Sequence, residues 1–439
     1  MPNLTTLLAI LQQSEYDFEY FDRWYTDHQS DHVLEIKPKV WTPKLKLIAA
    51  LAQALGWLPV SARLKVATSL TQPGEWLVRK LTYGRAWLKL RQAQNQGLVV
   101  VAFSGSYGKT STKQITAHVL SQFAPTLATS KSINTPLGIA QFVLQRLKPE
   151  HQYLLVELGE YYQGDITQLG QFVKPNYGVI CPVGRQHLER MGNLDTIAAT
   201  ILELAAVVKS PTQILIHESL RPFIKTPDLG SWYGHSPTCQ WRLTSAQVTR
   251  AGTEGKLVAA TQTQNIFSPL FGEHQLVNSL PSLWLAQQLA LDQTKALQAL
   301  RNTPFILHRH QPIFAENEVL ILDNGYNSNP DSAMASLKLL AALPASRRFV
   351  ITPGFVELGA ASQELHYSFG QQLAKQADFL GILESPNAKF IEQGWLAEGG
   401  RADHLVRAKS QEQAVTQLKS HFIPNSVILF ENNLPEVYI

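Results

Sequence analysis

The order of apolar and polar positions divides the chain into a helical first part and a longer part in which strands and helices alternate. Residues 1–96 carry polar and aromatic positions at helical spacing, with no catalytic pattern. From residue 98 onward, short β-branched runs alternate with helical stretches, which predicts a mostly parallel sheet covered by helices. The predicted strands here are 99–103, 153–158 and 177–182, and the predicted helices are 109–122 and 193–208.

The pattern changes again in the second half of the chain. Residues 231–271 are rich in Thr, Gln and Gly with alternating apolar positions, which predicts antiparallel strands before a helix at 275–290. Near residue 303 the strand-helix alternation restarts, and Pro330 suits the first turn of a helix. Strands are predicted there over 318–323, 348–353, 379–383 and 426–431. The predicted fold class is therefore α/β, with a mainly helical region over 1–96, a central domain over 97–302 and a C-terminal domain over 303–439.

Composition narrows the class of protein. A chain of 439 residues is too long for one ordinary core, and two or three domains of about 150 residues are expected. Its 45% apolar and 16% charged residues are typical of a globular enzyme rather than a disordered or fibrous protein. The two cysteines, Cys181 and Cys239, cannot form a disulfide framework or a four-thiolate zinc site, and they fit a reducing, cytoplasmic setting. A net charge of +4 without a long basic block gives no support for a nucleic-acid partner.

The sequence also bears on membrane contact. The N-terminus shows no charged-then-apolar signal peptide, and no window approaches the roughly 18 uncharged apolar residues of a spanning helix. The nearest candidate is L-I-A-A-L-A-Q-A-L-G-W-L-P-V, residues 47–60, which contains Trp57 and has basic flanks. Such a helix either lies on a membrane surface or buries its apolar face in a core or an interface. Burial is the more ordinary of the two, and peripheral membrane contact through residues 1–96 stays open beside it.

The stretch V-V-V-A-F-S-G-S-Y-G-K-T-S-T-K, residues 99–113, has the features of a phosphate-binding loop. After a predicted strand, Gly105 and Gly108 let backbone amides approach an anion at the start of the next helix. Lys109 would reach the β- and γ-phosphates, and the Thr110 hydroxyl would bind Mg²⁺. The usual spacing G-x-x-x-x-G-K-[ST] is not met, so this is a short form. The alternative is a glycine-rich turn with a chance G-K-T, which the flanking strand and helix disfavour.

Within this stretch, S-G-S-Y-G-K-T-S-T-K resembles the G-T-N-G-K-T signature of the Mur ligase family. The likeness covers about residues 98–439, because further segments follow in the family's order. L-D-N-G-Y-N-S-N-P-D-S is similar to the D-D-x-Y-N-A-N-P-x-S of MurF-type members, and T-P-G-F-V-E-L-G with His366 continues this likeness. The resemblance implies a P-loop central domain that binds ATP and a Rossmann-like C-terminal domain. The matching segments are 132–138, 155–166, 175–188, 271–280 and 322–332.

The resemblance implies an ATP-dependent peptide ligase with ATP and Mg²⁺ as cofactors. A carboxylate on a peptide-bearing acceptor would become an acyl phosphate, which an amine such as D-alanyl-D-alanine attacks in peptidoglycan biosynthesis. The residues assigned to the nucleotide are Gly105, Ser106, Tyr107, Gly108, Lys109, Thr110, Ser111, His274, Asn278, Arg309 and Asp323. Those assigned to Mg²⁺ are Thr110, Glu157 and His187, and those assigned to catalysis are Lys109, Glu157, His187, Asn327 and Asn329.

Physical reasoning on the same residues agrees with the resemblance. Phosphoryl transfer needs metal ligands and cations where phosphate charge gathers. Glu157 ends a predicted strand and His187 follows the next one, so both are expected at the carboxyl edge of the sheet, where open α/β folds bind ligands. By the resemblance, Asn278 contacts adenine, Arg309 a phosphate and Asp323 the ribose end, while Asn327 and Asn329 face the amine. Plainer alternatives are an ordinary loop histidine at 187, a capping or surface residue at 278 and a helix cap at 323.

The chain departs from the family pattern at a position that concerns catalysis. Family members carry a lysine, carbamylated to act as an extra carboxylate, two positions before a glutamate in the helix after the His187 loop. Glu203 is present, but the lysine position is Ile201. Lys209 lies nearly two turns further along the helix and points elsewhere. One acidic group is therefore missing, and a second Mg²⁺ site is in question.

The first part of the chain is the other departure. MurF-type enzymes begin with a small α/β domain that holds the UDP end of the nucleotide-sugar peptide, and residues 1–96 show no such pattern. Gln275 and Asn324 stand where Asn and Asp are usual, and the amide at 324 can keep a hydrogen bond. Two alternatives to the main hypothesis remain. One is a Mur-like ligase for another, lipid-linked carboxylate, and the other is an ATP-binding, ligation-inactive protein that serves as an interaction partner.

Overall fold

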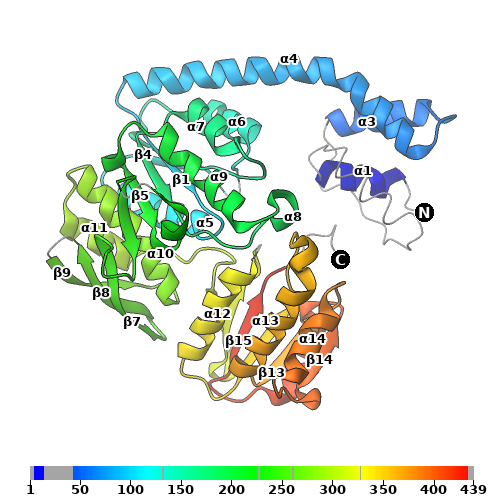
Figure 1. Cartoon of the computed structure of the whole chain (residues 1–439), viewed down its shortest axis with the longest axis vertical. Helices are drawn as coiled ribbons and strands as arrows, with labels where there is room; N and C mark the ends of the chain where they lie inside the picture. The colour runs from blue at the N-terminus through cyan, green and yellow to red at the C-terminus, as the bar shows by residue number, and fades with distance from the viewer. Residues whose placement is uncertain are drawn as a thin grey trace. The chain divides into compact units, whose positions relative to one another are not determined.

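The computed structural model describes residues 4–13, 43–130, 133–225, 228–259, 262–326 and 328–433. The chain forms two compact units, residues 1–85 with 435–439 and residues 86–434. The second unit contains two sheets, each with its own hydrophobic core (Figure 1). The predicted α/β class is confirmed, whereas the boundaries at 96 and 302 stay a prediction.

The described part of the first unit is helical, as predicted. Apolar side chains of three helices form a small core, in which Ile48 and Ala52 are fully buried. Both belong to the 47–60 segment, so its apolar face packs in a core, although Trp57 is 79% exposed. No helix in the described ranges is both long and apolar enough to cross a bilayer. The helices are α1 (Leu4–Gln13), α3 (Pro43–Ala54) and α4 (Val60–Asn95), the last of which continues into the second unit.

The central domain is built on a nine-stranded sheet in the order β2-β3-β1-β4-β5-β6-β7-β8-β9. Neighbouring strands are parallel from β2 through β7, and β7, β8 and β9 are antiparallel. The inner strands are mostly apolar and mostly buried, as expected of a parallel sheet with helices on both faces. The strands are β1 (Val99–Ser104), β2 (Thr126–Ala128), β3 (Tyr153–Glu157), β4 (Tyr177–Ile180), β5 (Ile214–His217), β6 (Ser231–Gly234), β7 (Trp241–Thr249), β8 (Gly252–Ala259) and β9 (Gln262–Ser268).

Seven helices accompany this sheet. The segment 231–271 was expected to be antiparallel throughout, and this is wrong for β6, which pairs parallel with β5 and so extends the parallel part. The helix predicted at 275–290 is present and carries much of the core against the sheet. The helices are α5 (Lys109–Ser121), α6 (Pro136–Arg146), α7 (Asp165–Val173), α8 (Leu188–Met191), α9 (Leu194–Val207), α10 (Glu273–Gln288) and α11 (Gln293–Arg301).

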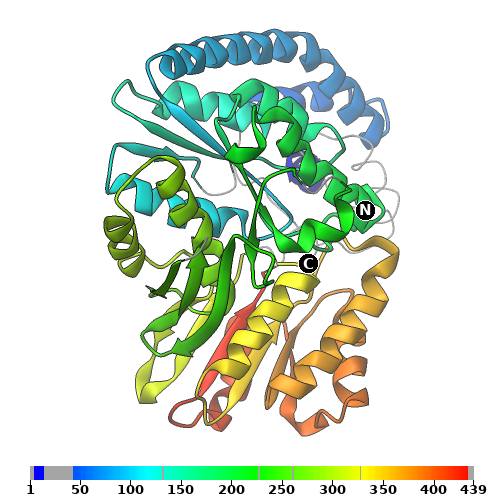
Figure 2. The same ribbon diagram turned by 60° about the vertical axis from the view of Figure 1, so that its left-hand side comes forward.

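The C-terminal domain is a second, six-stranded sheet in the order β10-β11-β15-β12-β13-β14. Only β10 is antiparallel to its neighbour. Figure 2 shows α12 (yellow) beside β15 (red). All four predicted strands are confirmed, and Pro330 begins α12. The elements are β10 (Gln311–Phe314), β11 (Leu320–Asn324), α12 (Pro330–Ala342), β12 (Arg348–Thr352), α13 (Ser362–Gln376), β13 (Phe379–Leu383), α14 (Ala388–Ala397), β14 (Leu405–Ala408), α15 (Gln411–Leu418) and β15 (Val427–Glu431).

Candidate active site

The loop between β1 and α5 has the backbone of an anion-binding turn. Gly105 has a φ of +135°, and a Cβ there would lie 2.6 Å from the Cβ of Cys181. Gly108, at the N-terminus of α5, has a φ of +79°, and a Cβ there would lie 2.9 Å from Oδ1 of Asn278. Only glycine meets both demands, so the loop can pack tightly and present amides to a phosphate. The buried Ser106 Oγ also has no hydrogen-bond partner within the described ranges, and a phosphate oxygen would provide one.

Lys109 is placed at the start of α5 by this turn. Its Nζ lies 2.6 Å from Oε1 of Glu160 and also donates to the Gly105 carbonyl oxygen. Lys109 is 8% and Glu160 is 2% exposed, so the pair is shielded from water. Burial raises the pKa of Glu160 above its ordinary value, although Lys109 opposes that shift. The short contact with Lys109 compensates for the burial of the Glu160 carboxyl group.

Glu157 lies beside this pair at the end of β3. Its Oε2 accepts hydrogen bonds from Thr110 Oγ1 and Lys113 Nζ, each at 2.9 Å. Burial would raise the pKa of Glu157, but Lys113 and Lys109 together hold it below the ordinary value. Burial lowers the pKa of Lys113, while Glu157 opposes that shift. Lys109, Thr110, Glu157 and Glu160 are called the phosphate-loop wall below.

His187 contacts Glu357, a residue of the C-terminal domain. His187 has a φ of +55° at the start of α8, and its Nδ1 hydrogen-bonds to Oε2 of Glu357. The ring of Tyr161 lies 4.8 Å from the His187 ring, between centroids. Arg190 stacks on Tyr161 at 5.0 Å and lies 3.9 Å from Glu357. His187 is therefore oriented from both domains, and its Nδ1 is occupied.

Residues after position 303 form the opposite side of the pocket. The guanidinium of Arg309 lies 4.5 Å from the ring centroid of Tyr326, and burial lowers the pKa of Arg309. Behind them, the buried Glu431 accepts hydrogen bonds from Asn324 at 2.9 Å and Ser328 at 2.6 Å. Burial raises the pKa of Glu431 in spite of these donors. Arg309, Asn324, Tyr326, Ser328 and Asn329 are called the C-terminal wall below.

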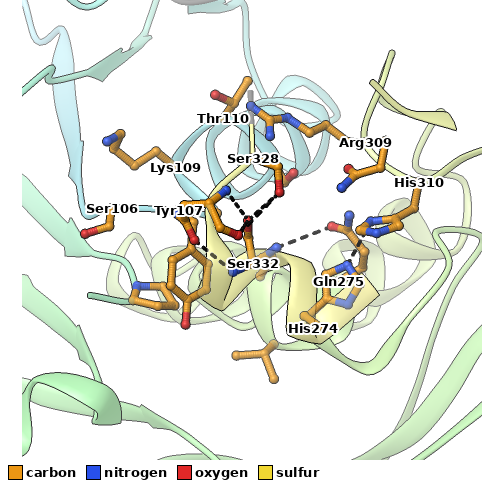
Figure 3. Close-up of a pocket in the computed structure, with 18 of the residues that line it drawn as sticks. Ser106, Tyr107, Lys109, Thr110, His274, Gln275, Arg309, His310, Ser328 and Ser332 are labelled. Atoms are coloured by element: carbon orange, nitrogen blue, oxygen red, sulfur yellow. Dashed lines mark hydrogen bonds between the residues drawn. The ribbon is translucent and has the colours of Figure 1, made fainter. Parts of the chain in front are cut away.

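A histidine pair joins the two domains at one end of the pocket. His274 Nε2 lies 3.1 Å from His310 Nδ1, and His310 Nε2 lies 2.8 Å from Ser336 Oγ. Burial lowers the pKa of His274 to about 4, and burial lowers that of His310 as well. In Figure 3, His274, Gln275 and His310 gather at one end and Ser106, Tyr107 and Lys109 at the other, while the side chain of Arg309 extends toward Thr110.

The two walls enclose a cavity of about 560 Å³, a size that suits a nucleotide with part of a second substrate. Across it, Arg185 of the central domain pairs with Asp331 of α12, with 2.5 Å between Nη2 and Oδ1. The residues of the sequence-based assignment that line it are Ser106, Tyr107, Gly108, Lys109, Thr110, Ser111, Glu157, His187, His274, Asn278, Arg309 and Asn329.

Two assigned residues within the described ranges, Gly105 and Asp323, do not line the cavity. Gly105 shapes the loop from behind, where its Cα faces Cys181. Asp323 lies 2.7 Å from Nδ1 of His308 and accepts from the Gly325 amide at 2.9 Å, and its expected role at the ribose stays a prediction. It stabilises the turn after β11 and does not cap α12. Asn327 lies outside the described residues.

The helix cap is Asn329. The Oδ1 of Asn329 accepts from the Ser332 amide at 2.8 Å, and the Asn329 amide donates to the Ser332 hydroxyl at 3.0 Å. Together these two hydrogen bonds form a complete capping box. Asn329 lines the pocket, yet its side-chain oxygen is engaged by α12. Its expected role toward the amine stays a prediction.

The departure in α9 is explained in part by the structure. Ile201 is fully buried, and its carbonyl oxygen accepts from Ser104 Oγ at 3.1 Å. Position 201 therefore lies beside the start of the phosphate loop. Glu203 points to α7, where it accepts from the Gly164 amide at 2.7 Å and the Thr167 amide at 2.9 Å. Glu203 is thus a cap of α7 and not a group of the pocket.

Mg²⁺ was expected on Thr110, Glu157 and His187. Thr110 and Glu157 are in contact, but among the described residues no three His, Cys, Asp or Glu side chains form a ready-made metal cluster. The pocket nevertheless fits a hard cation, because Oε2 of the buried Glu160 has no hydrogen-bond partner in the described structure. The sequence predicted no role for Glu160 or Lys113. Glu160 lies three positions after the assigned Glu157, and Lys113 lies three positions after the assigned Thr110.

Comparison with known proteins agrees with this geometry. The sequence matches the Mur ligase middle domain over residues 103–286 and the Mur ligase glutamate ligase domain over residues 308–431. The chain therefore belongs to the Mur ligase family, as the sequence predicted.

Within the family, the relatives carry one name. The chain is 31% identical to the UDP-N-acetylmuramoyl-tripeptide–D-alanyl-D-alanine ligase of Escherichia coli, over 66% of this chain and 65% of that protein. It is 29% identical to the enzyme of the same name from Synechocystis, over 76% of this chain and 71% of that protein. The match thus spans a little under two thirds of the Escherichia coli relative.

Solved structures show the same fold. MurF from Acinetobacter baumannii superposes with a TM-score of 0.69 at 23% identity, covering 81% of this chain and 77% of that one. MurF ligase from Thermotoga maritima in complex with ADP superposes with a TM-score of 0.71 at 23% identity, covering 81% and 80%.

Proposed function

We propose that this chain is an ATP-dependent peptide ligase that joins D-alanyl-D-alanine, or a similar amine, to the carboxylate of a peptidoglycan-precursor peptide. The observation that carries the proposal is a phosphate loop whose lysine, Lys109, faces one cavity together with Arg309 from the other domain. Relatives named for that reaction and an ADP-bound structural neighbour support it. A cytoplasmic setting, predicted from cysteine usage, goes with this proposal.

The reaction has two steps. A carboxylate oxygen of the acceptor attacks the γ-phosphorus of ATP, the bond to the β,γ-bridging oxygen breaks, and ADP and an acyl phosphate result. The amine then attacks the acyl carbon and loses a proton, and the carbon–oxygen bond to phosphate breaks to release inorganic phosphate.

The residues of the pocket fit these steps. Lys109 and Arg309 offset the charge of the transferring phosphoryl group, and the loop amides bind the phosphates. Asn278 and the histidine pair lie at the end where a nucleotide base would fit. Thr110, Glu157 and His187 would hold Mg²⁺, which neutralises phosphate charge when bound. Contact between the two walls excludes water that would hydrolyse the acyl phosphate.

The test is phosphate release from Mg-ATP by the full chain, with a muramoyl-tripeptide acceptor and D-alanyl-D-alanine, and product mass as the second readout. Release should require both substrates, yield the joined peptide and fall at least about 100-fold in Lys109→Ala. Nucleotide binding without release for any amine or acceptor would contradict the proposal and favour the ligation-inactive alternative.

A second candidate keeps the reaction and changes the acceptor. The described residues before β1 form helices only, so no α/β domain for a UDP group is seen there. A different carboxylate, including a lipid-linked one, is then the substrate. Activity with lipid-linked peptide but not with the UDP-linked peptide would select this candidate.

A further inference from the structure

The missing lysine at position 201 leaves the proposed ligase short of one acidic group near the transferring phosphoryl group. The side chain at 201 is aliphatic and buried, so it offers no ligand. Glu203 cannot replace it, because its two carboxylate oxygens are bound to the amides that begin α7. An acidic group beside the phosphate loop must therefore be supplied by a residue other than those at positions 201 and 203.

Three acidic residues line the described part of the pocket: Glu157, Glu160 and Glu273. Glu157 is already engaged by Thr110 and Lys113. Glu273 begins α10 and pairs with Lys338. Glu160 differs from both, because one of its oxygens is bound to Lys109 and the other, Oε2, is buried with no hydrogen-bond partner among the described residues.

A buried carboxylate oxygen without a partner is costly, and native structures rarely keep one without a reason. A bound cation removes that cost, and an ATP-binding loop is where a hard cation is brought in with the nucleotide. Position 201 and Glu160 also reach the same loop. The Ile201 carbonyl binds Ser104, directly before Gly105, and Lys109 Nζ donates to both Glu160 and the Gly105 carbonyl.

We propose that Glu160 supplies the acidic group that the family obtains from its carbamylated lysine, with Oε2 facing the nucleotide's divalent cation. This inference rests on the proposed function. When ATP binds, Lys109 turns from Glu160 to the β- and γ-phosphates, and the Glu160 carboxylate becomes available to the cation. The chain thus has a permanent carboxylate where related chains depend on CO₂ to make one.

The competing explanation is that Glu160 only positions Lys109. The two roles differ in how they depend on metal. A positioning residue would affect nucleotide binding equally with and without the cation. A residue that faces the cation would affect binding only when the cation is present.

The experiment measures the affinity of the full chain for a non-hydrolysable ATP analogue, by calorimetry, with Mg²⁺ and with EDTA. The gain in affinity from Mg²⁺ should fall at least about tenfold in Glu160→Gln, while affinity in EDTA stays within about twofold of wild type. Gln keeps an acceptor for Lys109 and removes the charge. The matched control is Glu150→Gln, which removes the same charge from an exposed loop.

Glu160→Asp keeps the charge on a shorter side chain and should lie between wild type and Glu160→Gln. It also guards against a folding defect in the Gln variant, which circular dichroism would reveal. An equal loss of affinity with Mg²⁺ and with EDTA, or identical Mg²⁺ dependence in wild type, Asp and Gln variants, would overturn the inference. Absence of nucleotide binding in wild type would overturn the proposed function instead.

A second readout follows from the carboxylate being permanent. Activity of wild type should not change, within about twofold, when bicarbonate and CO₂ are removed from the buffer. A fall of tenfold or more that bicarbonate reverses would show that a lysine carbamate is still needed, and the inference would fail.

Discussion

The two walls of the pocket are built from different kinds of interaction. In the phosphate-loop wall and directly behind it, buried charges are paired: Lys109 with Glu160, and the fully buried Lys113 with Glu157. In the C-terminal wall, the cation of Arg309 rests on the ring of Tyr326, and the acid Glu431 is held by neutral amide and hydroxyl donors. On the phosphate-loop side each buried cation contacts a buried acid, whereas Arg309 rests on an aromatic ring and interacts electrostatically with Glu157 and Glu431.

This difference suggests a division of labour. The central domain can hold its loop in the binding conformation before ATP arrives, because its charges are already paired. The C-terminal domain adds Arg309, which lines the same cavity and whose charge contributes to the reaction rate when phosphate is bound. Changes in the first wall should therefore act on stability as well as on activity, whereas changes in the second should act mainly on rate.

The largest expected effect is in the phosphate-loop wall. Lys113→Met should lower the free energy of unfolding by about 3–5 kcal/mol, because it leaves Glu157 as a buried carboxylate without its ion-pair partner. Urea unfolding measures it. The double variant Lys113→Met with Glu157→Gln should recover most of the loss, since no buried charge remains unpaired. A loss under about 1 kcal/mol in the single variant would contradict the one-to-one pairing.

On the C-terminal wall, Arg309→Ala should lower kcat/KM about 100-fold, because a cation that meets the phosphate is lost. Unfolding free energy should change less than in Lys113→Met, by about 1–3 kcal/mol, because Arg309 contacts Tyr326 and interacts electrostatically with Glu157 and Glu431. Steady-state kinetics and urea unfolding of the same preparations test both numbers. A large stability loss with little change in rate would reverse the assignment of the two walls.

The histidine pair should make stability depend on pH. The pKa of His274 is lowered from 6.5 to about 4 by burial, with Glu273 raising it and Lys338 lowering it. Between about pH 4 and pH 6.5, His274 therefore binds a proton in the unfolded chain but not in the folded chain. The free energy of unfolding has its full value above about pH 6.5 and falls as the pH drops toward 4. The expected loss at pH 5 is about 1–2 kcal/mol. Unfolding of wild type and His274→Gln at pH 7.5 and pH 5 tests this, and equal pH dependence in both would assign the loss to other groups.

The smallest effect is expected at the contact between the domains. Asp331→Asn removes the charge opposite Arg185, a partly exposed pair worth less than about 1 kcal/mol. kcat/KM should fall about threefold at low salt, and the difference from wild type should shrink at 1 M NaCl because salt screens the pair. Asp403→Asn, in an exposed pair with Arg401 away from the pocket, is the control and should change neither.

The sequence predicts the fold well where elements are long and apolar. Strands such as β1 and β3 are uniform buried runs between clear turns, and each lies where the pattern placed it. The short strands β2, β5, β10 and β14 were not predicted, because three or four residues carry too little periodicity to be distinguished from loop. β6 lies in the segment that was predicted to form antiparallel strands, and its parallel pairing is decided by tertiary packing rather than local pattern.

The site could be predicted to the extent that it follows the chain locally. Lys109 and Thr110 come from one loop, Glu157 ends β3, and His187 lies in the loop after β4, the two strands that flank β1. Asp323 could not be placed, because its partner His308 lies fifteen positions earlier and only the fold brings them together. Glu160 was missed for a similar reason, since nothing in the local pattern shows that it meets Lys109.

Glu203 has a consequence for how such chains are sorted. A search that recognises active family members by their lysine–glutamate pair would count Glu203 as one matching residue of that pair. Its carboxylate oxygens, however, accept hydrogen bonds from the amides of Gly164 and Thr167. Glu203 therefore indicates only that the N-terminus of α7 is capped, and it does not indicate whether the chain catalyses ligation. For chains of this kind, the identity of the residue at 160 is the more informative character, because its carboxylate lines the pocket and pairs with Lys109 of the phosphate loop.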